Sequence, residues 1–262
     1  MTTLADRTIT ELRRVHDDLA ARVAAFTDDD LSRTSGASDW TVAQVLSHLG
    51  SAAEIRTAGL HAALTGAEAP GPDFNPGVWD GWNAKGPRQQ ANDYVASEAA
   101  GLALVEGLTA GQRAELLVPV GFLPQPLDVA SWGGLWLNEA AQHSWDVRVA
   151  TDPDARVDSA AADVLLEHFT GALGFLLGFS GKADALSEQA VVALGDSGLQ
   201  LQVTDTVALT SGGVPSTATF TGGSESVIRL LGGRLKPPYL PGDLTVAGNV
   251  TLDDLRRVFP GY

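Results

Sequence analysis

Hydrophobic side chains recur every three or four positions through most of the first 150 residues. Residues 4–27 show this spacing clearly, with Ile9, Leu12, Val15 and Leu19 on one stripe. Such spacing is typical of an amphipathic helix. The same reasoning predicts three more helices, which cover 41–64, 87–109 and 128–150. Four helices with short to medium connections indicate a helical bundle.

Two of these predicted helices carry start signals. Thr41 is followed three residues later by Gln44, the pattern of a capping box. Asp128 precedes the fourth helix and can accept hydrogen bonds from its first turn. Both signals support the boundaries that the spacing suggests.

The pattern changes after Pro153. Residues 157–180 predict one helix, and short segments rich in β-branched residues then alternate with Gly, Asp and Ser. The predicted strands are Ala190–Leu194, Leu199–Thr204, Val207–Leu209, Ser216–Thr221 and Leu244–Val246, and the predicted helices between and after them are Ser224–Leu231 and Thr251–Val258. We therefore expect a bundle domain over 1–153 and a smaller α+β domain over 154–262.

A long segment rich in glycine, proline and tryptophan separates the second and third helices. We predict that 66–86 is a loop, and long loops in compact domains are often functional. Trp79 and Trp82 lie within it and would either form a wall of a pocket or cover the end of the bundle.

Composition narrows the class of protein. The 262 residues carry a formal net charge of −15, which argues against a protein that binds a phosphate backbone through clustered Lys and Arg. The longest apolar run, 173–179, is too short to span a membrane, and the first residues lack the apolar core of a signal peptide. We therefore expect a cytoplasmic protein. Cysteine is absent, so any thiol chemistry would need a sulfur from a small molecule.

The fourth predicted helix contains the most informative residues. Glu139, His143 and Asp146 share one half of this helix with Trp132 and Trp136. An apolar stripe is the face that a helix normally buries, and a buried carboxylate is costly unless it is paired, hydrogen-bonded or bound to a metal. Two interpretations follow: a metal site, or an ion pair with His or Arg that joins two helices.

Histidine also occurs on other predicted helices. His48 falls on an inward face of the second helix, where a histidine is either a ligand or a satisfied core residue. His16 is flanked by charged residues, which predicts a surface or boundary position, and His61 projects away from the face of His48. For His168 the sequence suggests no partner.

Three features together resemble a known family. They are Trp40-x7-His48, Glu139-x3-His143-x2-Asp146 and a tail that ends in GDLTVAGNVTLDDLRRVFPG. The chain resembles the mycothiol-dependent maleylpyruvate isomerase family within the DinB-like metalloenzymes. The resemblance implies a DinB-like four-helix bundle followed by a C-terminal domain similar to sterol-carrier proteins.

The resemblance also implies a site. Members hold a divalent metal, usually zinc, through a histidine of the second helix and a glutamate and a histidine of the fourth, which match His48, Glu139 and His143. Asp146 is expected either to accept a hydrogen bond from a ligand or to pair with Arg148 or Arg156 at the helix end.

The substrate side is expected to include cations and an aromatic residue. The resemblance implies a cationic residue of the second domain that faces the metal, for which Arg234 in Gly232–Arg234 is the best match and Arg229 the next. We assign Arg234 and Asp146 to catalysis and Arg229 and Trp82 to cofactor binding.

The expected function is a zinc-dependent enzyme that uses mycothiol. Its partners would be mycothiol and an electrophilic small molecule, without nucleic acid or membrane, and the chain would be a monomer or a homodimer. Two alternatives remain: a metal-dependent hydrolase in which the same residues activate water, and a non-catalytic binding module.

Overall fold

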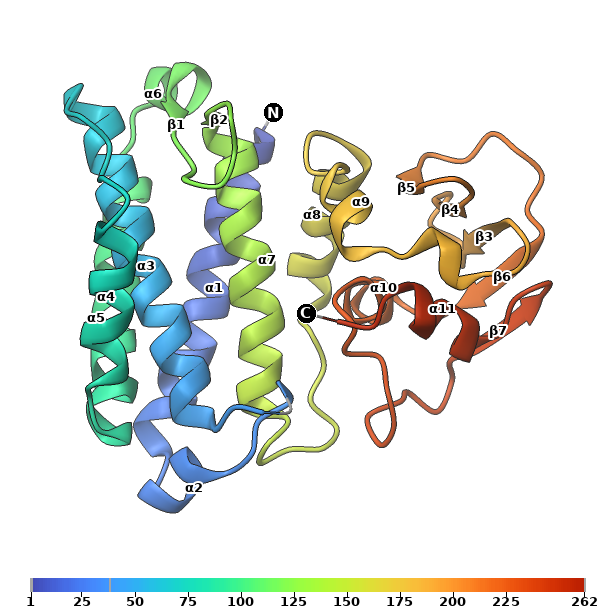
Figure 1. Cartoon of the computed structure of the whole chain (residues 1–262), viewed down its shortest axis with the longest axis horizontal. Coiled ribbons are helices and arrows are strands. Elements are labelled where there is room, and N and C mark those ends of the chain that lie inside the picture. Colours follow the sequence, from blue (N-terminus) through green and yellow to red (C-terminus); the bar gives the residue numbers. More distant parts are fainter. Residues whose placement is uncertain (1, 38, 262) are drawn as a thin grey trace. The chain divides into compact units, whose positions relative to one another are not determined.

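The computed structural model describes residues 2–37 and 39–261. The chain forms two compact units, Met1–Ala155 and Arg156–Tyr262 (Figure 1). Each has its own core, and each is described by itself.

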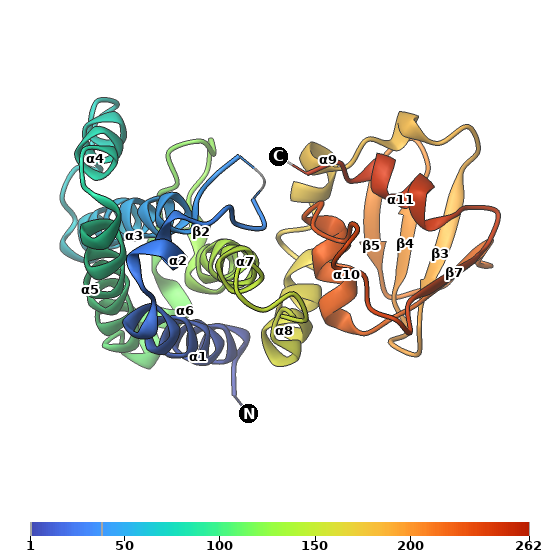
Figure 2. The same ribbon diagram turned by 90° about the horizontal axis from the view of Figure 1, so that it is seen from below.

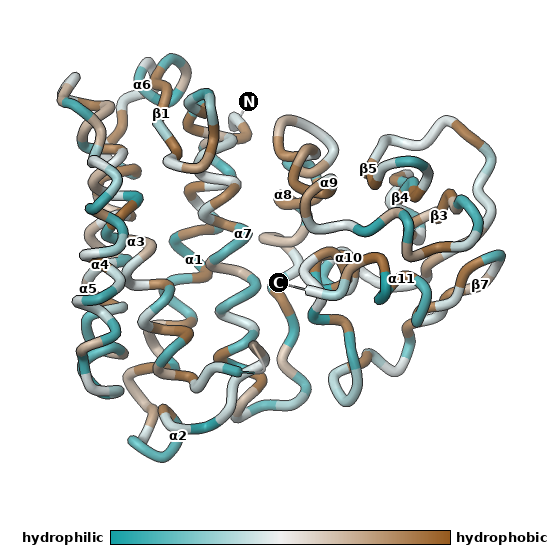
Figure 3. Tube along the Cα trace, viewed as in Figure 1, coloured by the Kyte–Doolittle hydropathy of each residue, from teal (hydrophilic) through white to brown (hydrophobic). Residues whose placement is uncertain are grey.

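The first unit is a bundle of four long helices. These are α1 (Leu4–Ala25), α3 (Val42–Thr65), α5 (Pro87–Glu106) and α7 (Val129–Arg148). Helix α3 packs against α5 and α7, and α1 packs against the same two helices. Hydrophilic and hydrophobic positions alternate along each of them (Figure 3). The predicted four-helix bundle is therefore confirmed.

Local signals fix where these helices begin. Thr41 and Gln44 form the predicted capping box, and the Asp128 side chain accepts a hydrogen bond from the backbone N–H of Ser131. The core behind the caps is aliphatic and aromatic; it contains Leu19, Val45, Leu46, Leu49, Trp82, Tyr94 and Val147, among others.

Short elements connect the long helices. They are α2 (Asp28–Ser32), α4 (Phe74–Asn83), α6 (Ala110–Glu115) and the strands β1 (Leu117–Val118) and β2 (Leu127–Asp128), which pair antiparallel. The prediction that 66–86 is a loop was wrong for its second half, which forms α4. This helix forms because Trp82 is buried against Gly50 of α3, where even a Cβ atom would come within 2.1 Å of the indole.

The second unit begins with two helices. They are α8 (Ser159–Thr170) and α9 (Leu176–Ser180), so the single helix predicted for 157–180 is interrupted. The break falls at Gly171–Gly174, where the chain turns so tightly that a Cβ on Gly174 would lie 2.9 Å from the carbonyl oxygen of Phe169.

A five-stranded sheet forms the rest of this unit. Its order is β5-β4-β3-β6-β7, and β3 and β6 are parallel while the other pairs are antiparallel. The strands are β3 (Ala190–Leu194), β4 (Gln200–Val203), β5 (Val207–Thr210), β6 (Ala218–Thr221) and β7 (Thr245–Gly248). Helices α10 (Ser224–Leu231) and α11 (Leu252–Val258) lie across the strands, as Figure 2 shows. The predicted α+β character of the C-terminal region is confirmed.

None of the helices within residues 2–37 and 39–261 is both long and apolar enough to cross a membrane.

Candidate metal centre

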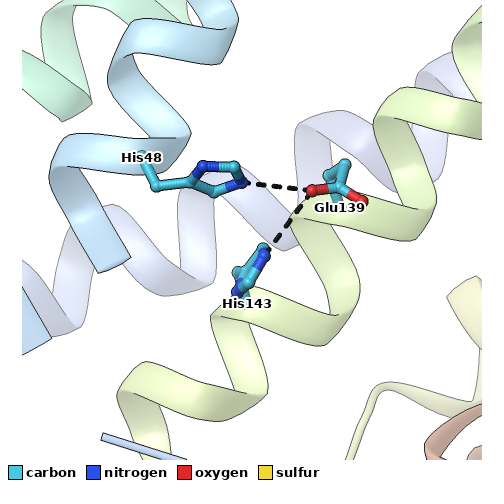
Figure 4. Close-up of side chains that lie close together, drawn as sticks. All are labelled: His48, Glu139 and His143. Atoms are coloured by element: carbon cyan, nitrogen blue, oxygen red, sulfur yellow. Dashed lines mark hydrogen bonds and ion pairs between the residues drawn. The ribbon is translucent and has the colours of Figure 1, made fainter. Parts of the chain in front are cut away.

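His48 of α3 and Glu139 and His143 of α7 converge in the first unit. Nε2 of His48 lies 3.2 Å from Oε2 of Glu139, and Nε2 of His143 lies 3.5 Å from the same oxygen (Figure 4). One ligand-type atom from each residue lies within 4.8 Å of those of the other two. The side chains that the sequence placed on inward faces of two helices are thus brought together.

Asp146 fixes the orientation of His143. Its Oδ2 lies 2.8 Å from Nδ1 of His143, and Asp146 is completely buried. A carboxylate at this distance accepts the N–H of Nδ1, so Nε2 of His143 can bind a metal when the ring is neutral or donate to Glu139 when the ring is protonated. This contact is the one expected if His143 binds a metal, and the role of Asp146 at such a site stays a prediction.

Charge is concentrated on Glu139. Burial by itself raises the pKa of Glu139, but hydrogen bonds with His143 and His48 outweigh this effect and hold the pKa well below its usual range. The carboxylate is therefore ionised over the whole neutral range. Two imidazole nitrogens and this oxygen face one another, so either an imidazole N–H points at the oxygen or a metal ion takes the place of that hydrogen.

The distances fit a metal. Zn–N and Zn–O bonds of about 2.1 Å at tetrahedral angles separate the donor atoms by roughly 3.4 Å, close to the observed 3.2 and 3.5 Å. The side chains of His48 and Glu139 are 33% and 30% exposed, whereas that of His143 is 8% exposed. The cluster can therefore hold a divalent metal through three protein atoms and leave one side accessible.

Two further residues lie against this cluster. The Trp40 ring is stacked 6.2 Å from the His143 ring and lies 5.3 Å from that of His48, so it covers both imidazoles. Gly36 donates its backbone N–H to the Asp146 carbonyl oxygen at 2.8 Å, and a Cβ on it would meet Oδ1 of Asp146 at 2.8 Å. Trp40 belongs to the Trp40-x7-His48 motif, whereas no pattern in the sequence points to Gly36.

A second polar cluster is formed by residues of α3, α5 and α7. Glu98 of α5 is buried, accepts a hydrogen bond from Nε1 of Trp136 at 2.5 Å and lies 3.4 Å from Nη2 of Arg56. The Arg56 guanidinium also lies over the Trp136 ring, 5.0 Å from its centroid. The sequence interpretation assigned no role to Arg56.

Trp82 is not brought to the metal centre. It donates from Nε1 to Glu54 at 2.8 Å and packs against Gly50, which is two positions from His48 and hence on the other side of α3. These contacts favour the packing interpretation of Trp82, and its role in cofactor binding stays a prediction without structural support.

The two predicted arginines belong to the second unit. Arg229 is fully buried and pairs with Glu225 at 2.8 Å, while its Nη1 donates to the carbonyl of Tyr239 at 2.8 Å. Arg234 is also buried and donates from Nη1 to the Gly232 carbonyl at 2.9 Å. Their participation at the metal centre stays a prediction.

The remaining histidines differ from one another. His16 is buried, 6.2 Å from the Tyr94 ring, so the prediction of a surface or boundary position was wrong. Its neighbour Arg13 also reaches α5, through an ion pair with Glu106, while the His16 ring lies against Tyr94 of α5. His61 is exposed and does not belong to the cluster, and His168 is buried on α8.

Comparisons with known proteins identify the fold. Two crystal structures match the fold: one of the mycothiol-dependent maleylpyruvate isomerase and one of its histidine-to-alanine mutant. Each match has 16% sequence identity and a TM-score of 0.63 and covers 95% of this chain and 98% of the other. At this identity the similarity establishes the fold alone. No match was found among curated protein sequences.

The sequence itself also matches a described family. The pattern of the mycothiol maleylpyruvate isomerase N-terminal domain covers residues 12–148, which is more than half of the chain and includes all three residues of the cluster. The chain therefore belongs to the mycothiol maleylpyruvate isomerase N-terminal domain family.

Proposed function

We propose that this chain is a zinc-dependent enzyme that binds mycothiol at the metal and transfers or transiently adds it to an electrophilic small molecule. The observation that carries the proposal is the cluster of His48, Glu139 and His143, accessible on one side, in a chain without cysteine. The family and the fold support the same reaction class, because the similar crystal structures are described as those of a mycothiol-dependent isomerase.

The donor set favours zinc. Two imidazoles and one carboxylate with an open position are typical of catalytic zinc sites, whereas structural sites use four protein ligands. When bound, such a metal lowers the pKa of a coordinated thiol, and the thiolate is the reactive nucleophile.

The protein side chains have separate tasks in this proposal. Asp146 holds His143 in the tautomer and orientation that a ligand needs. The Trp40 ring limits the movement of both imidazoles. Because Glu139 remains ionised at neutral pH, the site binds a cation without first releasing a proton from this carboxyl.

Metal analysis tests the site. The wild type, purified without chelator and supplied with zinc, should hold close to one equivalent, and His48→Ala, Glu139→Ala and His143→Ala should lose it. His61→Ala is the matched control, because His61 is an exposed histidine of the same helix outside the cluster. A wild type that retains no metal would refute the proposal.

Thiol binding tests the reaction class. With cobalt in place of zinc, saturating mycothiol should give an intense sulfur-to-metal charge-transfer band in the near ultraviolet. Turnover of an electrophilic substrate should depend on the thiol. A spectrum unchanged by mycothiol, together with thiol-independent hydrolysis, would support the water-activating hydrolase instead.

A further inference from the structure

The ion pair between Arg56 and Glu98 is unusually incomplete for a buried position. Arg56 approaches Glu98 through Nη2 at 3.4 Å. By contrast, Arg13 binds Glu106 with two nitrogens, at 2.7 and 2.8 Å, although that pair is more exposed. An arginine that serves only to neutralise a buried carboxylate is expected to form the close bidentate arrangement, because desolvation makes a loose pair costly.

Arg56 also has unused hydrogen-bonding capacity. Its Nε is buried and has no hydrogen-bond partner within residues 2–37 and 39–261. Arg113 and Arg256 also have one such nitrogen, but each holds acceptors at 2.6–2.8 Å through its other nitrogens. A guanidinium has five N–H donors in a planar fork suited to a carboxylate. Arg56 therefore keeps donors available for an additional acceptor.

Arg56 lies close enough to the metal centre for its unused donors to serve a ligand there. Helices α3 and α7 run in opposite directions (Figure 1), so Arg56, eight residues after His48, and Trp136, three residues before Glu139, lie on the same side of the cluster. Eight residues rise about 12 Å along a helix, and the long arginine side chain can cover much of that distance. Burial lowers the pKa of Arg56 below its usual value, and the charges of Glu98 and, to a smaller extent, Glu139 act in the opposite direction.

The Arg56 side chain is restricted in conformation but remains partly exposed to solvent. Stacking on Trp136 limits its conformations, and 14% of the side chain remains exposed. Although Nε itself is buried, other atoms of the Arg56 side chain remain exposed. A positioned cation that is partly exposed and lies within electrostatic reach of the proposed metal is suited to bind an anion.

We propose that Arg56 binds a carboxylate group of the ligand at the metal centre, and that the site therefore prefers thiols or electrophiles that carry a carboxylate near the reacting atom. This inference rests on the proposed function, because it concerns a ligand of the same site. It assigns anion recognition to a residue of the helical unit itself, in addition to any contribution from Arg234.

Two small thiols of matched size test the proposal on the full-length cobalt-substituted protein. Mercaptoacetate carries a carboxylate and 2-mercaptoethanol carries a hydroxyl, and the charge-transfer band reports binding of each. The measured quantity is the ratio of their dissociation constants, so that the intrinsic difference between the thiols cancels when variants are compared. Arg56→Gln should reduce the preference for mercaptoacetate by about tenfold or more, which corresponds to at least 1.4 kcal/mol.

Three further variants control this measurement. Arg88→Gln removes one positive charge from an exposed pair with Asp28 and should leave the ratio unchanged. Arg56→Lys should recover part of the preference, because it keeps the charge but not the fork. The double variant Arg56→Gln/Glu98→Gln avoids an uncompensated buried carboxylate and should lose the preference as fully as Arg56→Gln does, with bound cobalt unchanged.

The outcomes separate this proposal from the proposed function. If both thiols bind and the ratio in Arg56→Gln equals that of the wild type, Arg56 does not bind the anion. The proposal is then overturned while the proposed function stands. The double variant decides in the same way if Arg56→Gln does not fold. If neither small thiol nor mycothiol produces a band, the proposed function fails. Propionate then tests Arg56 separately: the affinity with which it perturbs the cobalt visible spectrum should weaken about tenfold in Arg56→Gln, and an unchanged affinity overturns the proposal.

Discussion

Replacement of Asp146 by asparagine is the most direct test of how the metal centre is oriented. The substitution keeps the size of a fully buried side chain and removes its charge. In the wild type, Oδ2 of Asp146 lies 2.8 Å from Nδ1 of His143. An asparagine can turn its amide N–H toward Nδ1, which would favour a proton on Nε2, the nitrogen that faces Glu139.

The expected magnitude follows from this single contact. Loss of a partner that orients a metal-binding histidine typically costs 10–100-fold in metal affinity, which is about 1.4–2.8 kcal/mol. A hydrogen bond to a charged group is worth about 1.5–3 kcal/mol, so the two estimates agree. We expect the zinc dissociation constant of Asp146→Asn to rise by 10–100-fold, and site occupancy to be regained at high zinc.

Competition with a chromophoric chelator measures this constant, and thermal unfolding of the metal-free protein measures any separate loss of stability. Asp163→Asn is a suitable control, because Asp163 is exposed on α8. A zinc affinity within twofold of the wild type would refute the assignment of Asp146. A lower melting temperature with unchanged zinc affinity would make its role purely structural.

Three further predictions concern other parts of the chain. Gly50→Ala should lower the free energy of unfolding by about 1–3 kcal/mol, because its Cβ would collide with Trp82, and urea unfolding should show this loss without a change in zinc affinity. The Asp6 carboxyl, hydrogen-bonded to Arg113, should titrate with a pKa of about 2 by NMR, and Arg113→Gln should raise this pKa. Because the folded pKa is below the unfolded one, the ionised carboxyl stabilises the folded state above about pH 4, and this stabilisation disappears as the pH falls toward 2. Arg234→Ala should lower kcat/KM by about tenfold or more with unchanged zinc content, and wild-type kinetics would remove Arg234 from the site.

The parts of the fold that the sequence predicts correctly are those set by local rules. The four long helices follow from three- and four-residue spacing and from caps such as Thr41 and Asp128, which act within a few residues of their own position. The helix α4 was missed because its formation depends on burial of Trp82 against Gly50, 32 positions earlier, and no local pattern reports that contact.

The same distinction applies to the metal centre. Glu139 and His143 could be identified because a carboxylate on an apolar helix face needs an explanation. Arg56 could not, because an isolated arginine beside an apolar stripe is usually a surface residue whose stem packs on the core; only the positions of Glu98 and Trp136 show that it is held inside. His16 was misjudged for the opposite reason, since its charged neighbours in sequence concealed its contact with α5.

The proposed metal ligands lie far apart in the sequence, and this separation affects how long the protein resists proteolysis. His48 and Glu139 are 91 positions apart, so a metal held between them acts as a removable cross-link across most of the helical unit. By mass action, a ligand at 100 times its dissociation constant stabilises the folded state by about 2.7 kcal/mol. The unfolded fraction available to proteases would then fall roughly a hundredfold. Zinc supply would set how long each copy of the chain survives, as well as whether it is active.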